Sequence, residues 1–275
     1  MKNKIYIYIA SALLITISLQ GECIPNQYRE SNISQLEHAL KEMHKLDLNG
    51  SEKILDIGSG DGKLSSYIVE KYIPNGQLVG IDKSNEMVSF ALSQNHNSNI
   101  NYQCVDAAEY SVPNEYDAVV SFWTLHWVSD YKKVVDNIAE SLKPGGKALL
   151  CHGIGTPLLL TIAENILNNT KWNAYRENAS LLKYPSLSQV AHIIEESGLI
   201  IESLEVKTNG IWMQSEDIIK NWLSLPMFDF IPPTLRKEYC QEILQIFTLD
   251  YPANEKGEIF RCSPVIVMVL KKRCA

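Results

Sequence analysis

The sequence predicts an α/β domain built on a doubly wound, seven-stranded, mostly parallel sheet, with a helical lid insertion before the last strand. From Glu52 onward, short apolar runs of strand length alternate with stretches of helical period, which is the pattern of βαβ units. Turn signals at Pro74–Gly76 and Lys143–Gly146 follow two of the helical stretches. Hydrophobic residues make up 45% of the 275 positions and charged residues 21%, which suits one large domain and excludes a disordered chain.

Strands and helices alternate regularly in the first half of the pattern. The strands are expected at Glu52–Ile57, Gln77–Asp82, Ile100–Val105, Tyr116–Phe122 and Lys147–His152. The helices are expected at Ser31–Leu46, Lys63–Tyr72, Asn85–Gln94 and Tyr131–Leu142. Strands connected in this way run parallel, so their carboxyl ends meet at one edge of the sheet, where ligands bind in such folds.

The pattern loosens after His152. Helices are expected at Pro157–Leu167, Ser186–Ser197, Ser215–Leu225 and Pro232–Phe247, and strands at Leu199–Val206 and Ile259–Lys271. No repeat, low-complexity tract or second core is apparent in the sequence. We therefore expect one domain over residues 22–275, with an apolar helical lid at about residues 212–250.

Residues 1–21 are typical of a signal peptide or a membrane anchor. Lys2 and Lys4 precede an apolar stretch at Ile5–Leu19, which is shorter than the roughly 20 apolar residues that span a bilayer. This segment predicts export or membrane tethering, and the alternative is an ordinary N-terminal strand. The six cysteines form no C-x-x-C pair, zinc spacing or disulfide framework, so no metal site is expected and a reducing compartment is favoured. The location of the protein is left open.

The chain is acidic, which bears on its partners. Its 25 Lys and Arg residues against 32 Asp and Glu residues give a net charge of −7, with a pI near 5.4. Affinity for a phosphate backbone comes mostly from cationic side chains. The composition therefore argues against a nucleic-acid partner.

The most informative stretch is the loop after the first strand, D-x-G-x-G-x-G at Asp56–Gly62. Glycines allow a tight turn from strand into helix and let a ligand approach bare backbone. A nicotinamide-cofactor loop has the spacing G-x-G-x-x-G/A, whereas Lys63 occupies the third position here. Asp82 ends the next strand, where a carboxylate can accept both hydroxyls of a ribose, and Asp106 follows the third strand. Carboxylates gathered at one crevice are costly without a ligand, so they predict a cofactor site.

With this loop and these acids, the chain from Ile24 onward resembles the class I S-adenosylmethionine-dependent methyltransferases, which have a Rossmann-like fold. The resemblance implies S-adenosyl-L-methionine as the cofactor and assigns Asp82 to its ribose hydroxyls. The residues implied for the methionine end are Asp56, Gly58, Ser59 and Gly60. The residues implied for the adenine are Lys83, Met87, Asp106 and Ala107. On residue type alone, the glycines could be simple turn residues and Asp106 a helix cap.

Three further stretches resemble a narrower group, the trans-aconitate and juvenile hormone acid methyltransferases and their bacterial relatives. Ser121–Val128 is similar to the group's S-F-x-x-L-H-W-V segment. Tyr28–Gln35 is similar to its Y-x-x-x-N-x-x-Q segment, and Thr156–Trp172 to its T-P…K-W segment. The resemblance implies a small-molecule acceptor, methylated on a carboxylate.

The narrower resemblance also implies which residues act on the acceptor. A carboxylate is already an anion near pH 7, so the site must align it rather than deprotonate it. The Gln35 amide and the Trp127 indole N–H would hold the carboxylate, and His126 would orient the acceptor or serve as a base. On residue type alone, Trp123 and Trp127 could be core aromatics and His126 a structural histidine.

The acceptor itself is left open. The apolar lid favours a hydrophobic monocarboxylate, because a compact tricarboxylate would need arginines, for which Arg29, Arg176 and Arg236 are the candidates. One alternative is methylation of malonyl-acyl carrier protein. Others are a non-catalytic, exported S-adenosylmethionine-binding protein and a nicotinamide oxidoreductase. The oligomeric state is not predicted.

Overall fold

The computed structural model describes residues 33–155, 157–179, 184–223 and 226–274. The predicted leader at residues 1–21, the stretch 28–32 with Arg29, and Thr156 lie outside the described residues. Within the described ranges, no helix is both long and apolar enough to cross a bilayer.

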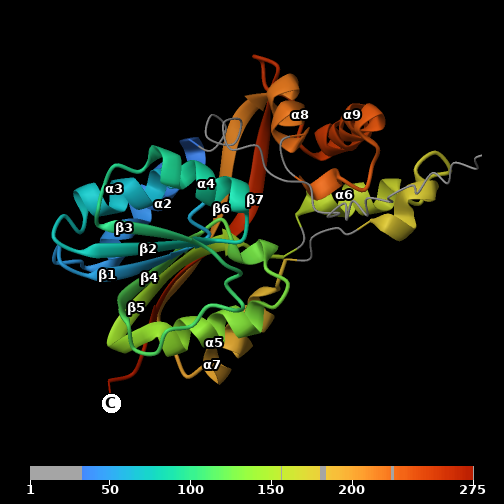
Figure 1. The fold of residues 1–275 in the computed structure, drawn as a ribbon. Coiled ribbons are helices and arrows are strands. Elements are labelled where there is room, and N and C mark those ends of the chain that lie inside the picture. The colour runs from blue at the N-terminus through green and yellow to red at the C-terminus, as the bar shows by residue number, and fades with distance from the viewer. Residues whose placement is uncertain (1–32, 156, 180–183, 224–225, 275) are drawn as a thin grey trace, which may run out of the picture.

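A single sheet organises the fold. Its strands are β1 (Lys53–Ile57), β2 (Gln77–Asp82), β3 (Ile100–Cys104), β4 (Tyr116–Phe122), β5 (Leu142–Gly153), β6 (Ile200–Gln214) and β7 (Glu258–Lys271). They form a seven-stranded sheet in the order β3-β2-β1-β4-β5-β7-β6 (Figure 1). β1 to β5 pair in parallel, and β7 is antiparallel to both β5 and β6. The predicted fold class is confirmed. The order reverses between β1 and β4, which places the ligand crevice at their carboxyl ends.

β5 begins earlier than predicted. The sequence predicts a turn at Lys143–Gly146 and a strand from Lys147, but the strand starts at Leu142. The pairing with β4 shifts from Tyr116↔Leu142 to Ala118↔Lys147, so the predicted turn is a bulge within the strand. Glycines and a proline therefore interrupt the pairing here without ending the strand.

β6 and β7 continue beyond the rest of the sheet as a two-stranded arm (Figure 1). The sequence predicts that β6 ends at Val206, but β6 runs to Gln214, which pairs with Glu258 of β7. β5 has already ended at Gly153. The residues after Val206 give no clear period-two signal, which explains the missed length. The arm comprises residues 207–214 and 258–264.

Helices cover both faces of the sheet. α2 (Ile33–Glu42), α3 (Lys63–Lys71) and α4 (Asn85–Gln94) lie on one face, and α5 (Tyr131–Ser141) and α7 (Leu187–Glu196) on the other (Figure 1). Alternate residues of β4 belong to the two resulting cores. Val120 belongs to the same hydrophobic cluster as Ile68 of α3, and Val119 to the same cluster as Ile138 of α5. All four side chains are fully buried, as expected for a central parallel strand.

A third hydrophobic cluster lies in a helical cap. The cap consists of α6 (Leu158–Ile166), η3 (Asn173–Asn178), α8 (Ser215–Leu223), η4 (Pro226–Phe228) and α9 (Pro233–Asp250). Buried Trp172, Trp222 and Tyr239 are among its largest side chains, and the Tyr239 hydroxyl donates to the carbonyl of Ala163 in α6 at 2.6 Å. The expectation of a single core is therefore wrong, because α6 joins the inserted helices. Residues 212–214 of the predicted lid belong to β6.

The sheet core can be tested by truncating a buried side chain. Leu150 of β5 is fully buried, so Leu150→Ala should lower the free energy of unfolding by about 2–5 kcal/mol. Leu249 of α9 is 80% exposed, so Leu249→Ala should change it by less than about 0.5 kcal/mol. Urea unfolding followed by circular dichroism measures both. Equal effects would contradict the assigned core.

Candidate active site

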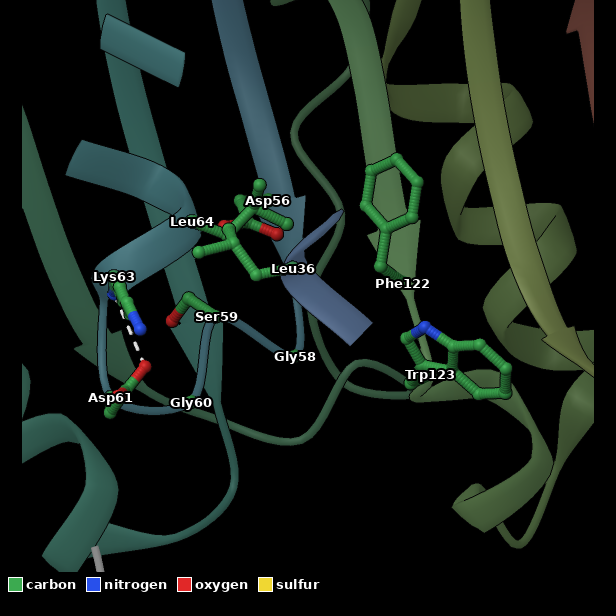
Figure 2. Close-up of a pocket in the computed structure, with 10 residues that line it drawn as sticks. All are labelled: Leu36, Asp56, Gly58, Ser59, Gly60, Asp61, Lys63, Leu64, Phe122 and Trp123. Atoms are coloured by element: carbon green, nitrogen blue, oxygen red, sulfur yellow. Dashed lines mark hydrogen bonds between the residues drawn. The ribbon is translucent and has the colours of Figure 1, made fainter. Parts of the chain in front are cut away.

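A pocket opens at the carboxyl ends of β1 and β4, between the glycine loop and α2. Residues that line it are Leu36, Asp56, Gly58, Ser59, Gly60, Asp61, Lys63, Leu64, Phe122 and Trp123. Figure 2 shows Asp56 and the glycine loop on one side, and Phe122 and Trp123 on the other. The crevice predicted from the strand order is therefore a real pocket. It contains the four residues predicted for the methionine end of the cofactor.

Gly58 allows the two central strands to approach each other. Its φ is +78°, and a Cβ at this position would overlap the Thr124 side chain that follows β4. The N–H groups of Gly58 and Ser59 both donate to the carbonyl of Ile81, at 2.8 and 3.0 Å. Because these amides are engaged, the loop can offer a cationic ligand its carbonyl oxygens rather than its N–H groups.

Asp56 is a buried carboxylate at the end of β1. It is 2% exposed, and the Ser65 hydroxyl of α3 donates to its Oδ2 at 2.6 Å. Burial raises the pKa of Asp56 to about 6; the Ser65 hydrogen bond opposes this shift and the nearby Asp82 adds to it. A charged Asp56 is therefore unfavourable unless a cationic ligand lies beside it.

Asp82 links the glycine loop to the end of β2. Its Oδ2 accepts from the Gly60 N–H at 3.0 Å, and its Oδ1 accepts from the Ser84 N–H at 2.9 Å. Burial raises the pKa of Asp82, although these two hydrogen bonds lower it. Two desolvated carboxylates, Asp56 and Asp82, thus lie on adjacent strands at the same edge.

The residues predicted for the adenine lie along β2 and β3. The Val105 N–H donates to the carbonyl of Asp82 at 3.0 Å, which holds these strand ends together. Asp106 Oδ1 accepts from the Ala108 N–H at 2.8 Å, so Asp106 closes a turn. The Ala107 carbonyl accepts from Asn137 of α5 at 2.9 Å. The remaining two lie beside Asp82: Lys83 follows it directly, and Met87 is buried in α4. Their contact with a cofactor stays a prediction.

Trp123 stands directly after β4 and has an unusual backbone. Its φ is +59°, a left-handed conformation that costs a bulky residue about 1–3 kcal/mol. Its ring centroid lies 5.7 Å from that of His38 in α2 and 6.5 Å from that of His126. Its buried Nε1 has no hydrogen-bond partner among the described residues. The sequence predicts that the side chains of the segment after β4, Trp123 among them, face the cofactor crevice, with a core aromatic as the alternative, and Trp123 does line the pocket.

His126 is buried and uncharged. The Gly153 N–H donates to its Nδ1 at 3.4 Å, so the ring proton is on Nε2. Burial lowers the pKa of His126 to about 3, and the nearby His152 lowers it further. Such a histidine is a poor general base near pH 7 but a good N–H donor.

His152 is a second buried histidine, adjacent to Gly153 at the end of β5. Its Nδ1 donates to the carbonyl of Gly153 at 2.9 Å, so its Nε2 accepts from the Tyr131 hydroxyl at 2.8 Å. Burial lowers the pKa of His152 to about 4. The Gly153 N–H alone therefore sets the tautomer of His126.

Tyr184 covers the end of β5 and reaches His126. A Cβ on Gly153 would come within 2.5 Å of the Tyr184 ring, so glycine is needed there. The Tyr184 and His126 ring centroids are 4.7 Å apart. Both residues line a second pocket beside α5 and α7, whose other lining residues are Leu125, Val128, Ser129, Tyr131, Pro185, Gln189, His192 and Ile193.

The predicted acceptor residues are only partly brought together. Trp127, in η2 (Leu125–Trp127), lies with its ring 5.7 Å from that of His126 and packs against the cap cluster. It is not among the residues that line either pocket described above. Gln35 is in α2, and its side chain lies outside the described residues. Trp127 and Gln35 as carboxylate donors therefore stay predictions.

Arg261 is the arginine that the sequence analysis overlooked. Arg236 is paired with Asp229, and Arg176 is exposed in η3. Arg261 is half-buried in the arm, and its guanidinium makes no hydrogen bond or ion pair within the described part of the chain. Burial lowers its pKa, and the charge interaction with Tyr184 raises it. Its position was hidden because the arm itself was not predicted.

Comparison with known proteins identifies the chemistry. The "Methyltransferase domain" family matches residues 54–146. The YcgJ protein of Bacillus subtilis has a similar fold, with a TM-score of 0.63 and 20% identity over 87% of this chain and all of that one. Phosphoethanolamine N-methyltransferase 2 of Haemonchus contortus, solved with S-adenosyl-L-methionine, gives a TM-score of 0.59 at 18% identity, over 90% of this chain and 56% of that one. The chain is a class I S-adenosylmethionine-dependent methyltransferase.

Within that class, the chain is similar to juvenile hormone acid O-methyltransferases. It is 26% identical to that of Drosophila melanogaster over 226 residues, 76% of each chain. It is 25% identical to that of Bombyx mori over 251 residues, 84% of this chain and 90% of that one. Malonyl-[acyl-carrier protein] O-methyltransferase 2 of Ilyobacter polytropus is 26% identical over 74% of this chain and 85% of that one. The oxidoreductase and non-catalytic alternatives are thereby set aside.

S-adenosyl-L-methionine is the cofactor, and the pocket fits it. Its ammonium and sulfonium charges suit a site where Asp56 and Asp82 are both held away from water. The buried Ser59 hydroxyl has no hydrogen-bond partner among the described residues and so is available to a ligand.

The role of Asp56 can be tested by removing its charge. Because folding raises its pKa from 3.8 to about 6, its ionisation destabilises the empty protein as pH rises through 6. Asp56→Asn should therefore raise the free energy of unfolding at pH 7 by about 2–3 kcal/mol and leave it unchanged at pH 4. The same variant should weaken S-adenosylhomocysteine binding roughly tenfold or more, because the charge-assisted contact is lost.

Urea unfolding at the two pH values and calorimetry measure these effects. Asp250→Asn, at an exposed site in α9, should leave both quantities near those of the unmodified protein. Unchanged cofactor affinity in Asp56→Asn would show that Asp56 does not contact the ligand.

Proposed function

We propose that this enzyme methylates the carboxylate oxygen of a hydrophobic acid. The observation that carries the proposal is the neutral, tautomer-fixed His126 at the end of the central strand. An alcohol or amine acceptor would need a base to remove its proton, and a histidine with a pKa of about 3 is a weak one. A carboxylate needs no base, and the Nε2–H of His126 can donate to it.

The remaining work of the site is alignment and desolvation. S-adenosyl-L-methionine, when bound, supplies an electrophilic methyl group on a cationic sulfur. Holding an acceptor oxygen in line with that group can account for about 7–11 kcal/mol of barrier lowering. Trp127 and Tyr184 pack against the apolar cap cluster, so the acceptor side of the β4 end is walled by apolar side chains. Such walls suit a long apolar chain behind a single carboxylate.

Arg261 supplies the counter-charge for an anionic acceptor. A guanidinium away from bulk water is costly without an anion, and no acid faces Arg261 among the described residues. The charge of Arg261 interacts with Tyr184, whose ring centroid lies 4.7 Å from that of His126. An acid bound there would be drawn to a cationic group while the cofactor occupies the carboxylate-lined side.

A malonyl-[acyl-carrier protein] O-methyltransferase is among the relatives. The basic side chains on the protein surface give this alternative less support. A carrier protein is acidic and calls for a free basic patch. The cluster at the end of β7 is largely engaged: Lys271 pairs with Glu202, and Lys272 bonds Asn114 and two carbonyls. We therefore favour a free acid.

The function is tested by supplying tritiated S-adenosylmethionine with matched acceptors. Dodecanoate and a sesquiterpenoid acid should yield base-labile methyl esters, whereas dodecanol and dodecylamine should give no product. Citrate and malonyl-acyl carrier protein report the two alternatives. Methylation of the amine or alcohol at rates equal to the acid would contradict the proposal.

Arg261→Gln tests the counter-charge. It should raise the KM for dodecanoate about tenfold or more, since a charged hydrogen bond is lost, and leave the Kd for S-adenosylhomocysteine unchanged. Arg176→Gln, at an exposed arginine, is the matched control and should alter neither. A KM unchanged in Arg261→Gln would remove Arg261 from the acceptor site.

A further inference from the structure

Ser65 is a polar side chain at a position where packing alone does not call for one. It lies in the first turn of α3 and is fully buried, where alanine has the higher helix propensity and buries no hydroxyl. A serine inside a helix usually donates to a carbonyl of its own helix or points to solvent. Ser65 instead donates to Oδ2 of Asp56 at 2.6 Å. Its hydroxyl therefore serves Asp56 and not the helix.

Asp56 depends on this hydroxyl. Its side chain lies in a residue that is only 2% exposed, so a charged carboxylate there needs hydrogen bonds from the protein. Among the described residues, Ser65 is the one whose side chain donates to it, and Oδ1 accepts from none of them. Asp56 also lines the pocket (Figure 2). One oxygen is thus held by α3, and the other is left for a ligand.

The groups around Asp56 do not take over the part of Ser65. Burial and the charge of Asp82 both raise the pKa of Asp56, and the Ser65 hydrogen bond is the interaction that lowers it. The segments of α2 and β4 that line the pocket carry no charged side chain there. The charged or titratable groups on the other elements around Asp56 are Asp82 of β2, Tyr102 of β3, Asp61 of the glycine loop and Lys63 of α3.

We propose that Ser65 is a positioning residue of the cofactor site, whose hydroxyl holds Oδ2 of the Asp56 carboxylate and leaves Oδ1 for the cationic methionine end of the cofactor. The hydrogen bond is charge-assisted, so it favours the ionised form of Asp56, which is the form that attracts a cation. The proposal rests on the predicted contact of Asp56 with the cofactor. It does not depend on the identity of the acceptor.

This role predicts a particular dependence on pH. The pKa of Asp56 is about 6, so cofactor affinity should be complete above that pH and should fall as the pH drops through it. Loss of a hydrogen bond to a charged group should raise this pKa by about one unit or more. Affinity should then begin to fall at a higher pH. A merely structural defect would instead lower the affinity equally at every pH.

The first test is calorimetry with S-adenosylhomocysteine between pH 5 and pH 8.5. At pH 8.5, Ser65→Ala should bind within about twofold of the unmodified protein, because Asp56 is ionised in both; at pH 6 it should bind about fivefold more weakly or worse. Ser65→Thr keeps the hydroxyl and should recover most of the loss. Binding at pH 8.5 also shows that each variant is folded.

Ser66→Ala is the matched control. Ser66 is the next residue of α3 and, like Ser65, interacts with Tyr102, but its hydroxyl is not bonded to Asp56. Ser66→Ala should therefore leave the pH profile of S-adenosylhomocysteine binding unchanged.

The second test follows Asp56 directly, without a ligand. The carboxyl carbon of Asp56, assigned in the NMR spectrum by its loss in Asp56→Asn, should titrate with a midpoint near pH 6, and about one unit or more higher in Ser65→Ala. In the Asp56→Asn background, Ser65→Ala should no longer change the pH profile of S-adenosylhomocysteine binding.

Two results would overturn the proposal at the hydrogen bond: an unchanged Asp56 midpoint in Ser65→Ala, or a loss of affinity of the same size at every pH. A midpoint that moves while the affinity at pH 6 stays the same would separate Asp56 from the cofactor and would overturn it as well. No acceptor is present in these measurements, so a failure of the proposed carboxylate methylation would leave them unaffected.

Discussion

The close approach of β1 and β4 at Gly58 is the constraint on which the site depends. The loop after β1 can pass Thr124 only because position 58 has no side chain, and its amides are held by the carbonyl of Ile81 at the end of β2. Three adjacent strands are thus joined at their carboxyl ends by one turn. Asp56, Asp82 and Trp123 are fixed relative to one another as a result, although they are far apart in the sequence.

The site separates charges of opposite sign. Asp56 and Asp82 are desolvated on the β1 and β2 side, while the half-buried Arg261 belongs to the arm. Burial disfavours the charged form of each of these groups, and a ligand of opposite charge beside it would offset that cost. A cationic methyl donor and an anionic acceptor would therefore be sorted to their own sides before they meet. The free energy of folding lost by burying these charged groups is the physical basis of the selectivity for ligands of opposite charge.

Local sequence signals predicted the parts of the structure that depend on local chemistry. Strands β1 to β4 and the glycine loop follow from apolar runs and turn residues, and the position of Asp56 and Asp82 at one edge follows from parallel connection. Ser65 and Tyr184 could not be found in this way, because each meets its neighbour in the site through a tertiary contact. Ser65 matters only because α3 brings it to Asp56, nine residues away in the chain.

The misjudged elements share another cause. The cap cluster was missed because α6 and α9 are distant in sequence and each carries only part of an apolar face. The two helices pack together only in the folded chain, where the Tyr239 hydroxyl donates to the Ala163 carbonyl. The length of β6 was missed because its outer half pairs with β7 alone. The spacing of apolar residues along one element indicates which of its faces packs against a core. The cap cluster and the outer half of β6 depend on partners far away in the sequence, so this spacing does not indicate them.

The arm has a mechanical consequence. β7 is anchored between β5 and β6 through Val265, and beyond that point it is paired only with β6. A two-stranded ribbon bends and twists more easily than a three-stranded one. A tilt of the cap would hinge where β5 stops, because the arm and the link from β5 to α6 both leave the sheet there. Such a tilt would alter the distance between Arg261 and the end of β4, so that admission of the acceptor and its alignment become a single motion.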